Sequence, residues 1–200
     1  IGLGNALVDV LARVDNDDIL QAMALPKGSM TLINDDMFLK INEYLLQQNT
    51  KLSNGGSAGN AIRALAHLDS CTGFIGKIGN DLYGQFFRKE LKKLSIEDKL
   101  LVSAERPSGV ASTFISEGGE RTFATFLGAA ATLLPEELTP EMFKDYTYLF
   151  IEGYLVQDHD LILQAIELAK REGLQVCLDM ASYNIVEENL EFFKLLLSKY

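Results

Sequence analysis

Apolar and polar positions along this chain predict strands and helices in turn. Short apolar runs predict buried strands, and longer segments whose apolar residues recur every three or four positions predict amphipathic helices. The predicted strands of a main sheet are residues 1–8, 72–75, 148–152 and 175–178. The predicted helices are residues 35–47, 59–68, 81–94, 161–172 and 186–197. Strands that alternate with helices in this way are typical of a parallel sheet with helices on both faces.

Some segments interrupt this alternation. Residues 10–14, 30–33, 109–116 and 121–126 have the pattern of additional strands, and a Gly-Gly loop at residues 117–120 separates the last two as in a hairpin. Strands inserted in this way do not have to join the main sheet. They predict either an ordinary edge hairpin or a small separate β layer.

Composition narrows the class of protein. The chain has 200 residues, of which 48% are hydrophobic, enough for one substantial core or a core with a small appendage. No apolar run reaches the length of a membrane helix, and a formal net charge of -10 argues against nucleic-acid binding. Cys71 and Cys177 lie in apolar runs, so we expect buried thiols in a reducing, cytoplasmic setting. Two histidines and two isolated cysteines offer no zinc site.

Three glycines crowd residues 54–60, between a short extended segment and a predicted helix. Glycine lacks a β-carbon and reaches positive φ, so such a turn lets a ligand approach the backbone, where the N–H groups of the first helical turn point outward. Asn60 is expected at the mouth of this helix. The turn is compatible with a plain strand-to-helix connection, with a nucleophile elbow, or with a binding site for a hydroxylated small molecule.

The nucleophile elbow rests on Ser57, because residues 55–59 match the pattern G-x-S-x-G of serine hydrolases. Such an enzyme also needs a histidine and an acid. His67 lies on the helix that follows the serine, and His159 lies in a polar segment that is typical of a solvated helix start. A serine hydrolase therefore stays an alternative and is not the favoured function.

The first predicted strand carries an amide and a carboxylate, Asn5 and Asp9, four residues apart. Residues an even number apart on a strand share a face, so both side chains can point the same way. A carboxylate and an amide together suit a polyol, because both accept hydrogen bonds from hydroxyls and the amide also donates. The alternative is that Asp9 ends the strand in a turn and Asn5 bonds to local backbone.

A second glycine-rich turn, residues 76–84, follows the next strand and leads into a helix that Asp81 could cap. Together with residues 54–60 it resembles the N-terminal signature of the PfkB (ribokinase-like) family of sugar and nucleoside kinases. The opening G-N-A-L-V-D resembles the adenosine-kinase branch in particular. Further matches follow in family order at residues 106–111, 153–155 and 178–182. Ala61 departs from the Ser or Thr of many members.

The resemblance implies an α/β fold, a ribokinase-like three-layer αβα structure with a central, mostly parallel sheet plus a small β lid. It assigns residues 1–9, 34–105 and 127–200 to the main α/β domain and residues 10–33 and 106–126 to the lid. A lid suits phosphoryl transfer because it excludes water that would compete with the acceptor hydroxyl.

The resemblance also implies an ATP-dependent phosphotransferase, with ATP and Mg2+ as cofactors, that acts on a primary hydroxyl of a sugar or a nucleoside. The choice of substrate stays open, as does the choice between a monomer and a lid-mediated homodimer. The family's catalytic motif, D-T-x-G-A-G-D, does not occur in these 200 residues. We therefore expect the catalytic Asp and its anion hole beyond Tyr200 and no kinase activity from this piece alone. A non-catalytic sugar-binding protein of the same fold is a further alternative.

The resemblance extends the candidate site beyond the first strand and the glycine turn. Tyr154 is expected to stack on or wall the sugar ring, and Leu127 and Phe126 to close its apolar side from the lid. Glu152 and Asp179 end strands, where ligands of α/β proteins bind, and are candidates for substrate and for nucleotide-phosphate contacts. The predicted substrate-binding residues are Asn5, Asp9, Gly55, Gly56, Asn60, Leu127, Glu152 and Tyr154.

Overall fold

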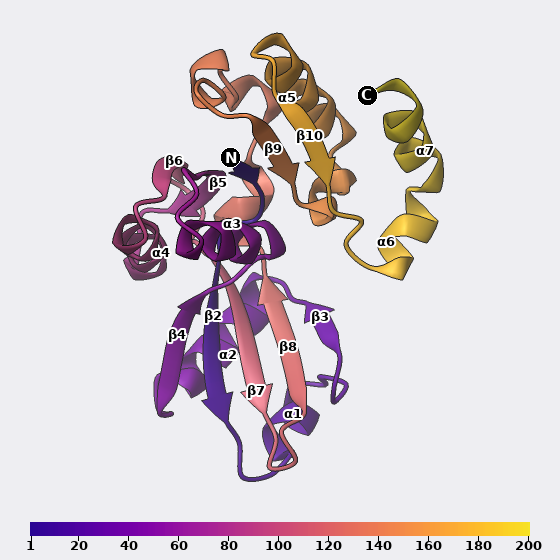
Figure 1. Cartoon of the computed structure of the whole chain (residues 1–200). Helices are drawn as coiled ribbons and strands as arrows, with labels where there is room; N and C mark the ends of the chain where they lie inside the picture. The colour runs from indigo at the N-terminus through magenta and orange to yellow at the C-terminus, as the bar shows by residue number, and fades with distance from the viewer.

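The computed structural model describes all residues 1–200 and contains two five-stranded sheets, one above the other in Figure 1. The first sheet consists of β1 (Gly2–Leu3), β5 (Gly73–Gly79), β6 (Glu97–Ser103), β9 (Tyr148–Ile151) and β10 (Gln175–Leu178). Its strand order is β10-β9-β1-β5-β6, and every neighbouring pair is parallel. The parallel main sheet that the alternating pattern predicts is therefore confirmed.

The second sheet is mixed and forms the lower part of the molecule in Figure 1. Its strands are β2 (Leu7–Arg13), β3 (Met30–Leu32), β4 (Thr50–Asn54), β7 (Gly109–Ile115) and β8 (Arg121–Phe126). In the order β3-β8-β7-β2-β4, β2 runs parallel to β7 and antiparallel to β4, and β7 and β8 form the hairpin expected around the Gly-Gly loop.

Seven α-helices and four short 3-10 segments join the strands. The helices are α1 (Asp18–Ala22), α2 (Asp35–Leu45), α3 (Ser57–His67), α4 (Leu82–Lys93), α5 (His159–Arg171), α6 (Tyr183–Glu188) and α7 (Leu190–Lys199). The 3-10 segments are η1 (Gly128–Thr132), η2 (Pro135–Glu137), η3 (Pro140–Met142) and η4 (Gly153–Gln157). No helix combines the length and the apolar character that crossing a membrane requires.

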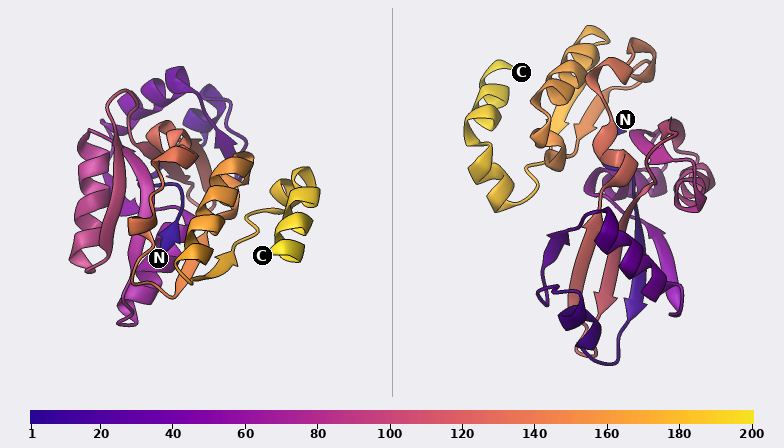
Figure 2. Two further views of the ribbon diagram at one scale, coloured as in Figure 1. Left: turned by 90° about the horizontal axis from the view of Figure 1, so that it is seen from above. Right: turned by 180° about the vertical axis from the view of Figure 1, so that it is seen from behind.

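Two hydrophobic cores cover the two faces of the first sheet. One lies under α5, α7 and the 3-10 segments and includes Leu3 and Phe193. The other lies under α3 and α4 and continues into the second sheet, where α1 and α2 cover one face. The view from behind shows α2 lying across this face (Figure 2). This arrangement is the ribokinase-like three-layer αβα fold with an added β layer.

The assignment of the first strand to the main sheet is only partly correct. Residues 1–8 form two strands, because the chain leaves the first sheet after Leu3 and enters the second at Leu7. Residues 50–54, also assigned to the main sheet's domain, pair with β2 in the second sheet, where Ser53 lies opposite Asp9. The apolar pattern runs unbroken through the crossing, and the pairing partner of a strand does not show in its own sequence.

Three further expectations need correction. The helix predicted over residues 186–197 is two helices, and Asn189 interrupts them by donating its side-chain amide to the carbonyl of Ile185. Cys71 and Cys177 are exposed, because Cys71 lies in the loop between α3 and β5, and β10 lies at the edge of its sheet. The strand β6 and the short helix α1 carry no clear apolar period and were not predicted.

Candidate substrate-binding site

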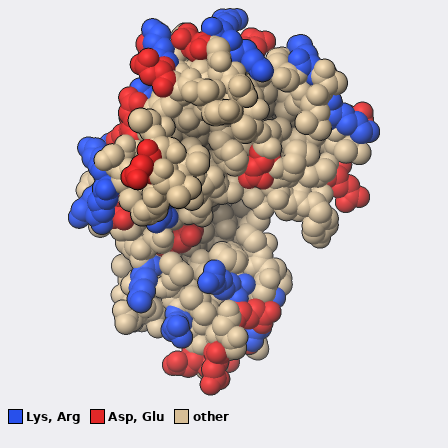
Figure 3. Space-filling model, in the orientation of Figure 1, with Lys and Arg blue, Asp and Glu red and all other residues tan.

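A cavity of about 540 Å³ opens between the two sheets, next to the carboxyl ends of β1 and β9. Figure 3 shows the hollow between the upper and lower parts of the molecule. Ligands of α/β proteins bind at the carboxyl ends of parallel strands. Five of the predicted residues line the cavity, namely Asn5, Gly56, Leu127, Glu152 and Tyr154.

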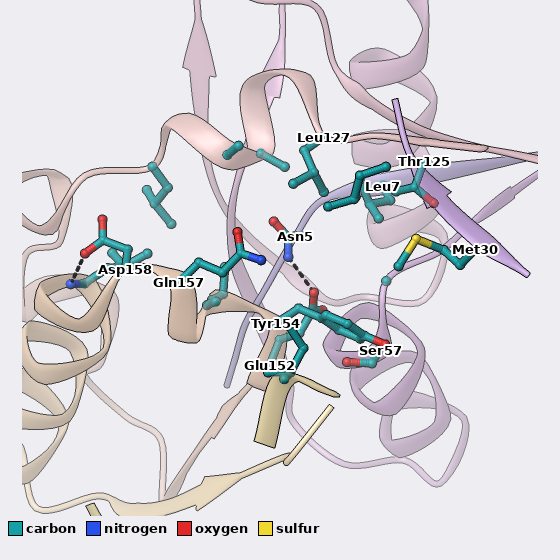
Figure 4. A pocket seen from close by; sticks show the side chains of 18 of the residues that line it. Asn5, Leu7, Met30, Ser57, Thr125, Leu127, Glu152, Tyr154, Gln157 and Asp158 are labelled. Carbon is teal, nitrogen blue, oxygen red and sulfur yellow. Dashed lines mark hydrogen bonds between the residues drawn. The ribbon is translucent and has the colours of Figure 1, made fainter. Parts of the chain in front are cut away.

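Asn5 and Glu152 form a buried pair at the floor of this cavity (Figure 4). The Asn5 Nδ2 donates to Glu152 Oε1 at 2.7 Å, and the backbone N–H of Ala58 donates to Glu152 Oε2 at 3.1 Å. The two residues are only 5% and 2% exposed. The bond to Glu152 fixes which way the Asn5 amide faces, so its carbonyl oxygen is the atom available to a ligand hydroxyl.

Glu152 mainly positions its neighbours, the Asn5 side chain and the start of α3. Burial raises the pKa of its carboxyl, and the hydrogen bonds from Asn5 and from the Ala58 backbone act in the opposite direction. The carboxylate also lies at the N-terminus of α3, where the helix dipole favours negative charge. Because both oxygens already accept hydrogen bonds, Glu152 holds the segment between β1 and β2 against the glycine turn rather than presenting a free carboxylate.

The glycines of the turn make room for groups of β2 and of the segment that precedes it. A β-carbon on Gly55 would overlap the Asp9 carboxylate, and one on Gly56 would press against the backbone carbonyl of Asn5. Gly56 also has a φ of 79°, which favours glycine. The space that we expected Gly55 to leave for a ligand is thus filled by Asp9.

Arg63 connects Asp9 to the other end of the glycine turn. Its guanidinium donates to the Asn54 carbonyl at 2.8 Å and to Asn60 Oδ1 at 3.4 Å. Burial raises the pKa of the half-buried Asp9 to about 6, and the charges of Arg63 and Arg121 act to lower it. Asp9, Gly55 and the exposed Asn60 therefore share one neighbourhood beside the cavity and are not among the residues that line it.

Ser57 has no histidine partner. Its hydroxyl donates to Asp179 Oδ2 at 2.8 Å, which joins the start of α3 to the end of β10. His159 stacks on Phe192 with ring centroids 3.7 Å apart, and His67 lies at the far end of α3. The geometry therefore does not assemble a serine hydrolase. Asp179 is held by this contact and by the Ala181 N–H, and it lies outside the cavity lining.

The apolar wall of the cavity differs in one residue from the prediction. Leu127 and Tyr154 line it as expected, but Phe126 is 2% exposed and stacks on Phe38 inside the core of the second sheet. Side chains alternate along β8, so Phe126 points away from the cavity and Thr125 toward it.

One end of the cavity has no counterpart among the residues that the sequence predicts. Gln157, Asp158, Asn184 and Glu188 lie there, on η4, at the start of α5 and on α6. Short 3-10 and helical turns leave no periodic signal, so nothing in the sequence brings these segments together. Asp158 caps α5 by accepting the Leu161 N–H at 2.9 Å.

Hydrogen bonds between Asp81 and Ser108 join the second sheet to the first. The hydroxyl of Ser108 and the backbone N–H of Ser108 each donate to the Asp81 carboxylate at 2.7 Å. Asp81 also caps α4, as predicted, by accepting the Gly84 N–H at 2.8 Å. The Gly79 N–H donates to the Ser108 hydroxyl at 2.9 Å. The end of β5 is thereby tied to the start of β7.

No group of three or more His, Cys, Asp or Glu side chains in the chain is placed to hold a metal ion. The carboxylates closest to the cavity are separately engaged, Glu152 with Asn5 and Asp179 with Ser57. These residues therefore do not fit a magnesium site, and no magnesium ligand is assigned among them.

The chain resembles known kinases in sequence and in fold. The chain is 27% identical over 206 residues to guanosine-inosine kinase of Escherichia coli strain K12, a match that covers 97% of this chain and 47% of that relative. It is 27% identical to ribokinase of Staphylococcus aureus over 74% of this chain and 51% of that relative. The crystal structure of adenosine kinase from Sinorhizobium meliloti superposes with a TM-score of 0.80 at 29% identity, covering 97% of this chain and 60% of that one.

The family model that matches describes pfkB family carbohydrate kinases and covers residues 29–191. The chain spans about half the length of the curated relatives it matches. Because the matched segment makes up most of the chain, this protein belongs to the pfkB family of carbohydrate kinases.

Proposed function

We propose that the protein is a kinase that transfers the γ-phosphoryl group of ATP to a hydroxyl of a sugar or a nucleoside. Family membership supports the class of reaction. The oriented side-chain amide of Asn5 carries the assignment to this cavity. It lines the cavity, and both Asn5 and Asp9 contact the glycine turn.

The polar groups divide the work of binding a polyol. The side-chain oxygen of Asn5 accepts a hydrogen bond from one hydroxyl. The Asp9 carboxylate lies beside the cavity lining and accepts from a hydroxyl that extends toward it. Gly56, at the start of α3, lets the ring approach the backbone, and Tyr154 with Leu127 forms its apolar wall. Holding the acceptor hydroxyl in one place supplies much of the rate enhancement in phosphoryl transfer.

ATP supplies the phosphoryl group and magnesium neutralises its charge when both are bound. The chain's own part is to bind and orient the acceptor and to keep water away from it. The second sheet covers the cavity opposite the first sheet. The hydrogen bonds between Asp81 and Ser108 hold the second sheet in position.

Equilibrium binding of a nucleoside to the Asp9→Asn variant tests this assignment. Asparagine has nearly the same shape but no charge, and a charged hydrogen bond is stronger than a neutral one, so we expect affinity to fall about 10-fold or more. Asp15→Asn, which removes an exposed carboxylate just beyond the end of β2, is the matched control and should bind like the unmodified protein. Equal affinity of Asp9→Asn and the unmodified protein would remove Asp9 from the site.

The reaction itself is tested by measuring ADP formation by the full-length protein with ATP, magnesium and either ribose or a nucleoside. Phosphorylation of one of them supports the kinase. Binding without any ADP formation from the full-length protein contradicts it and supports a non-catalytic sugar-binding protein of the same fold.

A further inference from the structure

Lys77 lies in the second glycine-rich turn, near the carboxyl end of β5, and other protein groups occupy all of its donors. Its side chain is only 11% exposed. The ammonium donates to both carboxylate oxygens of Glu137 at 2.7 Å and to the backbone carbonyl of Thr132 at 2.9 Å. An ammonium has three N–H donors, so these contacts use all of them. Lys77 does not line the cavity, and it therefore has no donor to offer a ligand.

Lys77 instead holds a loop that forms one wall of the cavity. This wall segment, residues 127–137, follows β8 and contains η1 and η2. The residues that it contributes to the cavity are Leu127, Ala130, Ala131 and Leu133. Thr132 ends η1 and Glu137 ends η2, so Lys77 ties both short helices to β5. Glu137 also accepts the backbone N–H of Leu134 at 2.9 Å, which closes the loop between the two helices.

The wall segment has little regular structure of its own to keep it in place. η1 has five residues and η2 has three, and 3-10 turns this short make few internal hydrogen bonds. At the start of the segment, the Ala129 N–H donates to the carbonyl of Pro107 at 2.7 Å. Toward its end, Leu133 packs in the core under α5, but apolar packing is not directional. The bonds from Lys77 therefore set where this end of the wall lies.

We propose that Lys77 is a positioning residue, which holds the wall segment at the separation from Tyr154 that the acceptor ring needs. The inference rests on the proposed function, in which that ring lies beside Asn5. Figure 4 shows Leu127 of the wall segment and Tyr154 of η4 on either side of Asn5. A wall that moves away loses contact with the ring and admits water, so the acceptor binds weakly and its hydroxyl is poorly placed. Lys77 acts through the wall and touches no reacting atom.

The second glycine-rich turn thereby has a structural task in the site. Asp81 in this turn binds Ser108, where the chain enters the β7–β8 hairpin. Lys77 in the same turn binds the carbonyl of Thr132, just after the chain leaves that hairpin. The turn thus fastens both ends of the hairpin to β5 of the first sheet.

Binding of ribose and of inosine to the full-length protein with Lys77→Met tests this role. Methionine has a similar length but no donor, so the wall segment loses its attachment to β5. We expect the affinity for whichever probe binds the unmodified protein to fall about 10-fold or more, because part of an apolar contact surface is lost. In steady-state kinetics the KM for the acceptor should rise with it, and the KM for ATP should stay within about 2-fold. Lys77→Arg keeps the charge and the donors and should retain most of the affinity.

Lys99→Met is the matched control. Lys99 lies on the neighbouring strand β6, pairs with Glu97 at 2.6 Å and has a side chain that is 22% exposed, so the variant removes a similar ion pair away from the cavity. It should leave the affinity unchanged at a temperature where thermal unfolding shows that all variants are folded. If Lys77→Met does not fold, Glu137→Gln takes its place. Glutamine keeps the shape of the partner without its charge, and binding should weaken about 3-fold or more.

Unchanged affinity in a folded Lys77→Met variant, or an equal loss in Lys99→Met, overturns the positioning role while the proposed function stands. Unchanged affinity in Glu137→Gln overturns it in the same way where that variant carries the test. An unmodified protein that binds neither ribose nor inosine contradicts the proposed function instead.

Discussion

The carboxylate of Asp9 occupies the space that a β-carbon on Gly55 would fill. Asp9 belongs to β2 and Gly55 to the turn between β4 and α3, so the contact joins two segments that are far apart in the sequence. The pairing of β2 with β4 brings them together, with Asp9 opposite Ser53. A glycine is therefore required at residue 55 because of a protein side chain.

Replacing Gly55 with Ala should displace the Asp9 carboxylate. We expect nucleoside or ribose affinity to fall about 10-fold or more and the free energy of unfolding to fall by roughly 1–3 kcal/mol, the usual cost of overpacking. Calorimetric titration and urea denaturation measure the two effects. Gly118→Ala is the control, because nothing lies within 4 Å of a β-carbon there. Equal effects of the two substitutions would show that the Asp9–Gly55 contact is unimportant.

Ligand affinity should rise with pH around the pKa of Asp9, which burial raises to about 6. The ionised carboxylate is the better acceptor, so binding should strengthen from about pH 5 to about pH 7. Arg63 on α3 and Arg121 on β8 face this group and stay positively charged across that range. The Asp9→Asn variant should lose this pH dependence. A profile that is the same in both proteins would assign it to another group.

Stability should depend on Asp9 with the opposite sign. Its pKa in the folded protein lies above the ordinary value of an aspartate, so the folded state holds the proton more tightly than the unfolded chain. The free energy of unfolding should therefore fall as pH rises from about 4 to about 6, relative to the Asp9→Asn variant. Urea denaturation at several pH values measures the difference. A free energy of unfolding that rises over this interval, relative to that of Asp9→Asn, would contradict the raised pKa.

The Asp81 side chain should contribute more to stability than an ordinary helix cap, because it also binds Ser108. Asp81→Ala removes the cap of α4 and both hydrogen bonds to Ser108, and we expect the free energy of unfolding to fall by about 2 kcal/mol or more. Asn34→Ala removes only the cap of α2, through Met37 N, and should cost about 1 kcal/mol. Similar losses in urea denaturation would mean that the bonds to Ser108 add nothing.

Ser57 should not react with a fluorophosphonate probe. Its hydroxyl donates to Asp179, and no histidine is present beside it to act as the general base that activates a serine nucleophile. Intact mass after incubation with the probe should equal that of the untreated protein. A mass increase that disappears in Ser57→Ala would restore the hydrolase alternative.

The local elements were largely readable from the sequence. The period of three and four along residues 161–172 predicted α5, whose apolar stripe is buried, and Asp81 caps α4 as its place before the helix indicated. The turn at residues 54–60 and the polar pair of the first strand were found because glycines, amides and carboxylates stand out in an apolar background. Ordered matches along the chain then identified the family.

Pattern alone determined most of the strands and helices, because burial of one face leaves a period that such a segment carries by itself. Tertiary structure alone decided which sheet each strand joins, and thereby that Asp9 meets Gly55, that Phe126 faces the core and that Cys177 lies at an open edge. It also decided that Gln157 reaches the cavity, since η4 and α6 have no period of their own. Pairing and packing depend on residues distant in sequence, and a local pattern holds no record of them.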